Sequence, residues 1–181
     1  MKHIYRKDRI DRGNGSLEVK IMIRRARLDD IDELVELWKR FMAQQRGLGG
    51  ELAVDMLPRM KEDAQDIVRS YISRSIRGRN GFVMVVEDRG KLRGYMLSRI
   101  QKNIPIFKNE YTGYVSDLYL DEGYRGKGLS SKMWVRTLQW FREKGVGEVG
   151  IRVLSYNHAA YEVYRRWGFR DYLKELRIDL D

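Results

Sequence analysis

The stretch of residues 115–141 constrains the fold of this chain more than any other part of its sequence. β-Branched, aromatic and aliphatic residues dominate positions 115–120, so a strand is predicted there. A turn-rich break at 121–124 leads into residues 125–128, whose sequence is Arg-Gly-Lys-Gly. Apolar residues then recur near the 3.6-residue period through 129–141, which predicts a helix with one apolar face. The rest of the chain must fit around this strand, glycine-rich turn and helix.

This arrangement suits the binding of a phosphate or pyrophosphate group. The first turn of a helix has N–H groups without intrahelical partners, and the helix dipole favours negative charge there. Gly126 and Gly128 lack the Cβ atoms that would keep a ligand away from those groups, and Arg125 and Lys127 can add positive charge at the rim. The spacing matches neither a P-loop nor the G-x-G-x-x-G pattern. The simpler alternative is a flexible connection whose cations face water.

Composition excludes several other kinds of active site. The 181 residues most simply form one domain, and the absence of cysteine rules out disulfides, thiolate catalysis and cysteine-ligated zinc. His3 and His158 are the only histidines, so a histidine-rich metal site is excluded and no metal is expected. No apolar run reaches the roughly 18 residues of a membrane span. The polar start has no signal-peptide core, so we expect a soluble, cytoplasmic protein with no membrane partner.

The formal net charge of +10 raises the question of a polyanionic partner. Residues 1–27 contain nine Lys or Arg against three Asp or Glu, so six of the ten excess charges lie at the N-terminal end. The others are dispersed among acids along predicted helices. Such a distribution suits solubility, an acidic substrate or a phosphorylated cofactor. It is weak evidence for nucleic acid, which we do not expect as a partner.

Read in order, the sequence predicts a basic, flexible N-terminal extension at residues 1–19 and a single domain at 20–181. The predicted order is β-α-α-β-β-β-α-β-α-β. Besides the elements above, we expect strands at 20–26, 82–86, 92–100 and 149–154, and one or two more within 169–180. We expect helices at about 31–42, 58–75 and 157–167.

A second motif lies at residues 157–169. Asn157 is a good N-cap, Tyr164 follows two turns later near the same helical face, and Gly168 ends the helix. Together with the pattern Arg125-x-x-Gly128-x-Ser130, this segment resembles the GNAT superfamily of N-acetyltransferases. That family has an R/Q-x-x-G-x-G/A loop followed by an N-x-x-A-x-x-x-Y-x-x-x-G-F helix. The chain departs from both patterns only at Ser130, where a small residue is kept, and the resemblance covers about residues 20–180.

The resemblance implies an α/β (α+β) GNAT fold. This fold has a central mixed, mostly antiparallel twisted sheet of six to seven strands, flanked by about four helices and splayed between its two central strands. It also implies acetyl-CoA as the cosubstrate, with its pyrophosphate on the loop amides and its pantetheine along the strand. The cofactor-binding residues implied in this way are Leu118, Tyr119, Leu120, Arg125, Gly126, Lys127, Gly128, Leu129, Ser130, Asn157 and Tyr164.

The chemistry implied is direct attack of a primary amine on the thioester. Tyr164 matches the family tyrosine that protonates the departing thiolate. Asp117 is a candidate general base, with a strand carboxylate paired to a surface cation as an equally weighted alternative; Glu110 is a lesser candidate, and His158 is expected to be exposed. The acceptor could be a small-molecule or peptide amine, and a homodimer is left open. The alternative function is a non-catalytic acyl-CoA-binding or sensing module of the same fold.

Overall fold

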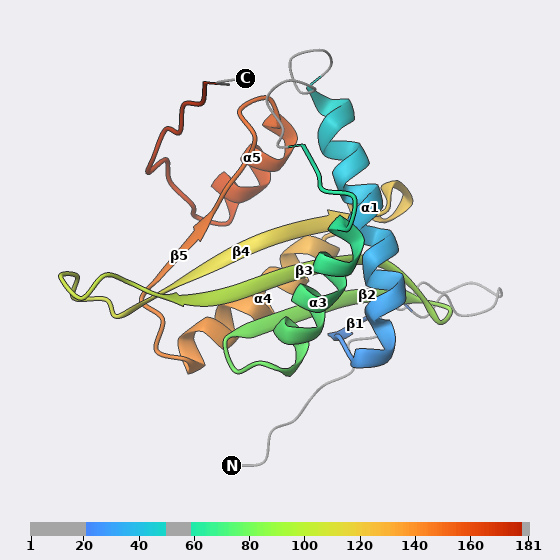
Figure 1. Ribbon diagram of the computed structural model, residues 1–181, viewed down its shortest axis with the longest axis horizontal. Helices are drawn as coiled ribbons and strands as arrows, with labels where there is room; N and C mark the ends of the chain where they lie inside the picture. The colour runs from blue at the N-terminus through green and yellow to red at the C-terminus, as the bar shows by residue number, and fades with distance from the viewer. Residues whose placement is uncertain (1–20, 50–58, 179–181) are drawn as a thin grey trace.

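The computed structural model describes residues 21–49 and 59–178, in which helices cover both faces of one sheet (Figure 1). The predicted extension at 1–19 lies outside these residues. The elements are β1 (Ile21–Arg25), α1 (Ile31–Leu48), α3 (Ala64–Arg77), β2 (Gly81–Asp88), β3 (Lys91–Lys102), β4 (Tyr111–Leu120), α4 (Leu129–Glu143), β5 (Glu148–Ile151) and α5 (His158–Arg166), with short 3-10 turns at Leu28–Asp30 and Glu122–Tyr124.

The strands follow one another across the sheet in the order β1-β2-β3-β4-β5. The first four are antiparallel, and β5 lies parallel to β4 because α4 carries the chain back across the sheet. This arrangement confirms the predicted mixed, mostly antiparallel sheet, and the four helices of the described residues agree with the predicted number.

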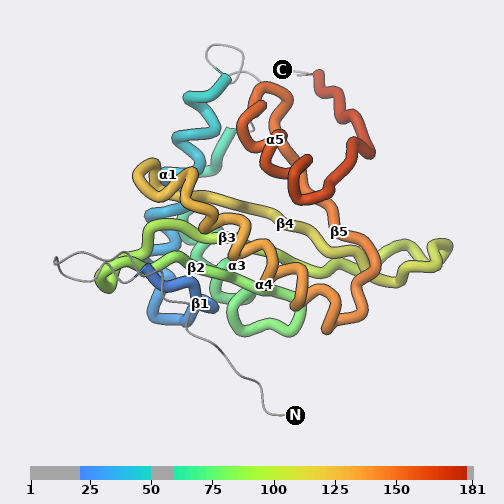
Figure 2. The backbone as a smooth tube through the Cα atoms, turned by 180° about the vertical axis from the view of Figure 1, so that it is seen from behind, coloured from blue at the N-terminus to red at the C-terminus, as the bar shows by residue number. Residues whose placement is uncertain are grey.

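Side chains of the strands alternate between two cores. Val83 and Val85 of β2 pack with Tyr95 of β3 under α1 and α3. Met84 and Val86 point to the other face, which α4 covers with Leu129, Met133 and Phe141. Figure 2 shows α4 on the opposite side of the sheet from α1 and α3. Because both faces are buried, β2 has the unbroken apolar run from which it was predicted.

β4 and β5 splay apart as a splayed sheet predicts, although β5 is the outer strand of the described sheet and not one of two central strands. Thr112–Val115 of β4 pair with Glu148–Ile151, but β4 continues to Leu120 with no residue of β5 beside it. On the other edge, Leu97 and Ser98 of β3 lie opposite Asp117 and Val115, so Ser116 is an extra residue in a β-bulge. A bulge bends its strand and increases the local twist. Figure 1 shows β5 diverging from β4 beyond this point.

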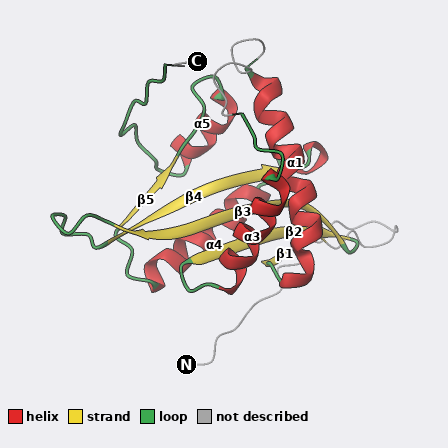
Figure 3. Cartoon of the chain, viewed as in Figure 1, coloured by secondary structure: helices red, strands yellow, loops and turns green. Residues whose placement is uncertain are grey.

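The C-terminal region differs from the prediction. One or two strands were expected within 169–180, yet residues 169–178 form none and appear as a loop in Figure 3. The described sheet therefore has five strands instead of six or seven. The reason is a lack of packing, since residues 170–178 are exposed along their whole length. The predicted strand at 149–154 also ends early, at Ile151, where the splay begins.

Candidate functional site

The free edge of β4 forms one wall of the candidate site. From Ser116 to Leu120, the edge of β4 that faces away from β3 has no strand beside it in the described residues. Peptide groups on such an edge are available to a ligand that carries amides of its own. The segment contains the predicted residues Leu118, Tyr119 and Leu120, of which Leu118 is only half-buried.

The glycine-rich loop forms the second wall. Gly126 and Gly128 have φ angles of +70° and +72°, and a Cβ atom at either position would meet nothing within 4 Å. The N–H groups of residues 126–131 make no hydrogen bond within the described residues; the first bonded amide is that of Lys132, which donates to the Gly128 carbonyl at 3.1 Å. Bare amides at a helix start favour an anion. Leu129 is buried in the core and anchors the helix below them.

Arg125 ties this loop to its surroundings. Its Nε donates to the Leu120 carbonyl at 2.9 Å, and its Nη2 donates to Oε1 of Gln44 in α1 at 2.8 Å. The guanidinium also lies 5.9 Å from the centre of the Tyr119 ring. The Lys127 ammonium lies 5.4 Å from the ring centre of Tyr124. Arg125 thus ties the loop to β4 and α1, and the supply of positive charge to an anion by Arg125 and Lys127 stays a prediction.

Tyr164 lies close enough to Asp117 for the carboxylate charge to affect its hydroxyl. Tyr164 of α5 packs against Trp167 and Phe169, with ring centres 5.7 and 6.2 Å away. Burial, and then the negative charge of Asp117, raise the pKa of Tyr164 to about 12. Asp117 keeps some solvent exposure as a residue, but protein atoms surround its carboxyl group. The site thus combines a tyrosine that keeps its proton at neutral pH with a nearby carboxyl group.

The partner of Asp117 is a residue that the sequence did not single out. The Tyr95 hydroxyl donates to Oδ2 of Asp117 at 3.2 Å. Burial raises the pKa of Asp117 to about 6, while the Tyr95 hydrogen bond and the charge of Arg99 oppose the rise. No cation lies within ion-pair distance of Asp117 in the described part of the chain. Asp117 is therefore not the ion-paired surface carboxylate that we considered as its alternative role.

The sequence analysis named three further residues, Asn157, His158 and Glu110. Asn157 caps α5 as predicted, since its Oδ1 accepts from the Ala160 N–H at 3.2 Å. His158 is exposed, as predicted. Glu110 pairs with Lys102 at 3.6 Å at the far end of β4, so the structure does not bring it to Asp117. Tyr156, which was not predicted, has a buried hydroxyl without a hydrogen-bond partner in the described residues.

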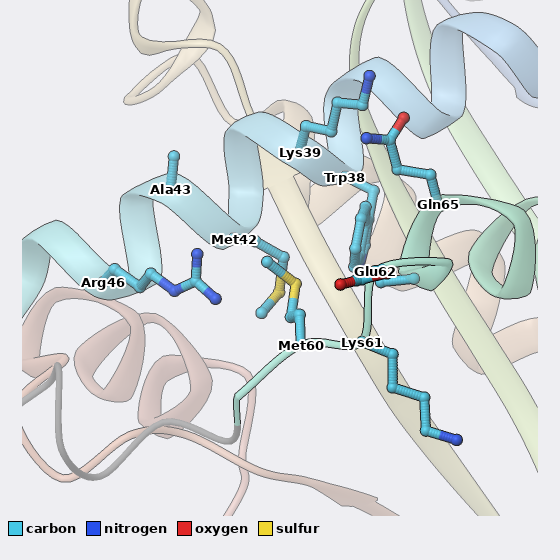
Figure 4. Close-up of a pocket in the computed structure, with 10 residues that line it drawn as sticks. Trp38, Lys39, Met42, Ala43, Arg46, Met60, Lys61, Glu62 and Gln65 are labelled. Atoms are coloured by element: carbon cyan, nitrogen blue, oxygen red, sulfur yellow. The ribbon is translucent and has the colours of Figure 1, made fainter.

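Two hollows lie on the α1 and α3 side of the sheet. The first, of about 190 Å³, lies between α1 and residues 60–65, with Trp38, Met42 and Met60 around it in Figure 4. It contains none of the predicted site residues. The second, of about 590 Å³, is lined by three arginines, Arg74, Arg79 and Arg99. Leu97 of β3 lies opposite Asp117, and Arg99 is two residues further along the same strand. Residues two apart on a strand point to the same face, so the basic hollow is on the same sheet face as the Asp117 carboxyl group.

Within residues 21–49 and 59–178, no helix is both long and apolar enough to span a bilayer. The same residues contain no group of three or more His, Asp or Glu side chains placed to hold a metal ion.

Comparison of the sequence with known protein families points to the family whose two motifs it resembles. The sequence model of the Acetyltransferase (GNAT) family matches residues 51–169, more than half of the chain. Two curated relatives are the thialysine N-epsilon-acetyltransferases of Sus scrofa and Bos taurus, which are 33% and 31% identical over 58 residues. Each match covers 32% of this chain, and the chain spans only 34% of the length of either relative.

Comparison with solved structures shows the same fold. A predicted acetyltransferase from Clostridium acetobutylicum, solved with acetyl-CoA, aligns with a TM-score of 0.72 and 18% identity, covering 88% of this chain and 96% of its own. An aminoglycoside N-acetyltransferase in complex with CoA aligns with a TM-score of 0.69 and 13% identity, covering 94% and 97%. At these identities the likeness concerns the arrangement of strands and helices.

Proposed function

The chain belongs to the GNAT acetyltransferase family, and from this premise we propose that it transfers an acetyl group from acetyl-CoA to a primary amine. The observation that carries the proposal is the loop of unbonded amides at residues 126–131, together with a buried tyrosine, Tyr164, that feels the charge of Asp117. A proton donor and a proton acceptor are what aminolysis of a thioester requires of a protein. The test is release of CoA thiol on incubation with acetyl-CoA and a panel of amines, with the acetylated product identified by mass spectrometry.

The residues at the splay fit the parts of acetyl-CoA. The N–H groups of residues 126–131 would hold the pyrophosphate, because they are unbonded and no side chain at Gly126 or Gly128 covers them. The free edge at residues 118–120 would pair with the amides of the pantetheine, and the Asn157 side chain would bind the same arm. When bound, acetyl-CoA supplies the activated acetyl group; the protein supplies position and proton transfer.

In the proposed mechanism, Asp117 accepts a proton from the ammonium of the acceptor, directly or through a water molecule. The free amine then forms a C–N bond with the acetyl carbon while the C–S bond breaks. Tyr164, which its high pKa keeps protonated at neutral pH, donates its proton to the departing sulfur to give the CoA thiol. The new amide nitrogen still carries one extra proton, which passes through water to the Tyr164 phenolate and restores its hydroxyl, while Asp117 releases its proton to solvent. Tyr95 is a positioning residue, since its hydroxyl holds Oδ2 of Asp117.

The alternative function, an acyl-CoA-binding or sensing module without catalysis, uses the same loop and strand edge. The presence of both Tyr164 and Asp117 favours catalysis, because binding alone needs neither group. Binding of acetyl-CoA with no thiol release across a broad panel of amines would support the sensor.

The loop gives a first testable prediction. Gly128→Val should weaken acetyl-CoA binding by about tenfold or more, equivalent to about 1.4 kcal/mol, since the new side chain projects where the ligand must approach the amides. A left-handed backbone also costs a valine about 1–2 kcal/mol of stability. Gly90→Val is the matched control, because Gly90 has a φ of +75° and equally open surroundings at the β2–β3 turn. Isothermal titration should show that only Gly128→Val loses affinity; equal affinities would contradict the loop assignment.

The basic hollow gives a second prediction, on acceptor choice. The cations Arg74, Arg79 and Arg99 should repel a polycation, so kcat/KM for spermidine should be about tenfold lower than for an amine that carries a carboxylate. Replacing Arg74 and Arg79 by Glu should reduce this preference, whereas Arg142→Glu on α4 should not. A preference for spermidine in the unmodified chain would exclude this route for the acceptor.

A further inference from the structure

A buried carboxylate beside the glycine-rich loop takes no part in the proposed mechanism. Asp88 is the last residue of β2, and its exposed fraction is 7%. Its Oδ2 accepts a hydrogen bond from the Tyr124 hydroxyl at 2.5 Å. Its Oδ1 is buried and has no hydrogen-bond partner, and no ion pair joins Asp88 to a cation in the described part of the chain. A carboxylate buried in this way lowers the stability of a fold, so stability does not account for its presence.

Tyr124 connects this carboxylate to the loop. It ends the 3-10 turn at Glu122–Tyr124, and its ring packs against the core on the α4 face of the sheet. The Lys127 ammonium, in the middle of the loop, lies 5.4 Å from the ring centre, and the Arg93 guanidinium lies 5.7 Å from it. Cations are attracted to the face of an aromatic ring. The hydrogen bond to Asp88 also raises the pKa of Tyr124, so the hydroxyl remains the donor at neutral pH.

The loop itself has little to hold its shape. The N–H groups of residues 126–131 make no hydrogen bond within the described residues, and two of these residues are glycines, which restrict the backbone least. Arg125 holds the start of the loop to β4 through the Leu120 carbonyl. The bond from Tyr124 is a second attachment, and it reaches a different strand, β2. A loop that is already ordered binds its ligand without losing further conformational freedom.

We propose that the hydrogen bond from Tyr124 to Asp88 orders the loop, so that the amides of residues 126–131 are held in the shape that binds a pyrophosphate. This inference rests on the proposed binding of acetyl-CoA. Tyr124 is a positioning residue, because it acts on the ligand through the loop and through the Lys127 ammonium beside its ring. Without the bond, a smaller fraction of molecules would hold the loop in the binding shape, and the apparent dissociation constant would rise by the same factor.

Tyr124→Phe tests the proposal on the full chain, since it removes the hydroxyl and keeps the ring. Isothermal titration should show a dissociation constant for acetyl-CoA about tenfold higher, while kcat at saturating acetyl-CoA stays within about twofold. Acetylpantetheine lacks the pyrophosphate, so kcat/KM for this donor should be the same in both chains. Tyr161→Phe is the matched control, because it removes a hydroxyl that donates to another carboxylate, that of Asp171. Its affinity for acetyl-CoA should not change.

Two further variants separate positioning of the loop from a defect of folding. Tyr124→Phe leaves the buried Asp88 carboxylate without its partner, which destabilises a fold. The double variant Asp88→Leu, Tyr124→Phe replaces both polar partners by apolar groups of similar volume, so its Tm should stay close to that of the unmodified chain. It should show the same loss of affinity for acetyl-CoA. Asp88→Asn keeps an acceptor oxygen for the Tyr124 hydroxyl and should retain affinity within about threefold.

Unchanged affinity in the double variant, once its Tm shows that it is folded, overturns the proposal. An equal loss with acetylpantetheine also overturns it, because the defect would then lie elsewhere than at the pyrophosphate. Binding of acetyl-CoA without turnover in the unmodified chain would contradict acetyl transfer alone, and the titrations would still decide the role of Tyr124. An unmodified chain that binds no acetyl-CoA would overturn both proposals.

Discussion

Tyr164→Phe is expected to lower kcat by at least about 100-fold, the lower end of the usual contribution of a positioned general acid. The substitution removes only the hydroxyl, so the ring keeps its packing against Trp167 and Phe169. The departing sulfur would then leave without a proton from the protein. The acetyl-CoA dissociation constant should stay within about twofold, because the loop and strand edge are untouched. Steady-state kinetics and isothermal titration measure the two effects separately.

Tyr161→Phe is the matched control for this experiment. Tyr161 is on the same helix, but its hydroxyl donates to Asp171, and its pKa is affected by Asp171 and not by Asp117. We expect its kcat to remain close to that of the unmodified chain. Unchanged turnover in Tyr164→Phe would show that the sulfur is protonated by water or another group, and equal losses in both variants would point to a structural effect of α5.

The strand, loop and helix at 115–141 could be predicted because each part has a local cause. Apolar strand residues, glycines at the turn and a 3.6-residue repeat are all read from neighbouring positions. The left-handed φ angles of Gly126 and Gly128 are a second reason for glycine there, besides the missing Cβ atoms. Asn157 was likewise predicted as a cap and does bond the amide of Ala160.

Contacts between distant parts of the chain could not be predicted in this way. Tyr95 looked like any core aromatic, and its bond to Asp117 depends on the register of β3 and β4 and on the bulge at Ser116. A buried tyrosine hydroxyl needs a partner, and this was the one signal that could have singled it out. The strand predicted within residues 169–180 was wrong for the opposite reason: residues 176–178 have a strand pattern, but a strand also requires a neighbouring strand.

Asp117 makes the activity of the site depend on pH. A carboxyl group is a base only when ionised, and burial raises the pKa of Asp117 to about 6. If Asp117 is the base, kcat/KM should rise with pH through about 6. The Asp117→Asn variant should no longer show this rise, and its kcat should be at least about 100-fold lower. Glu110→Gln, which alters an exposed carboxylate paired with Lys102, should change neither. A pH profile unchanged in Asp117→Asn would assign proton removal to water or another residue.

The same substitution should stabilise the fold, which separates a catalytic role from a structural one. Because the folded-state pKa of Asp117 is raised, its folded form holds a proton that the unfolded chain has already lost between about pH 4 and 6. Its contribution to stability is therefore lost as pH rises through this window. Above about pH 6, the buried charged carboxylate lowers the free energy of unfolding by about 1–3 kcal/mol, and Asp117→Asn would remove this loss. We expect a higher Tm than the unmodified chain at pH 7.5 and little difference at pH 4, as measured by calorimetry. A lower Tm at pH 7.5 would mean that Asp117 supports the fold through its charge, and loss of activity in the variant could then not be attributed to catalysis.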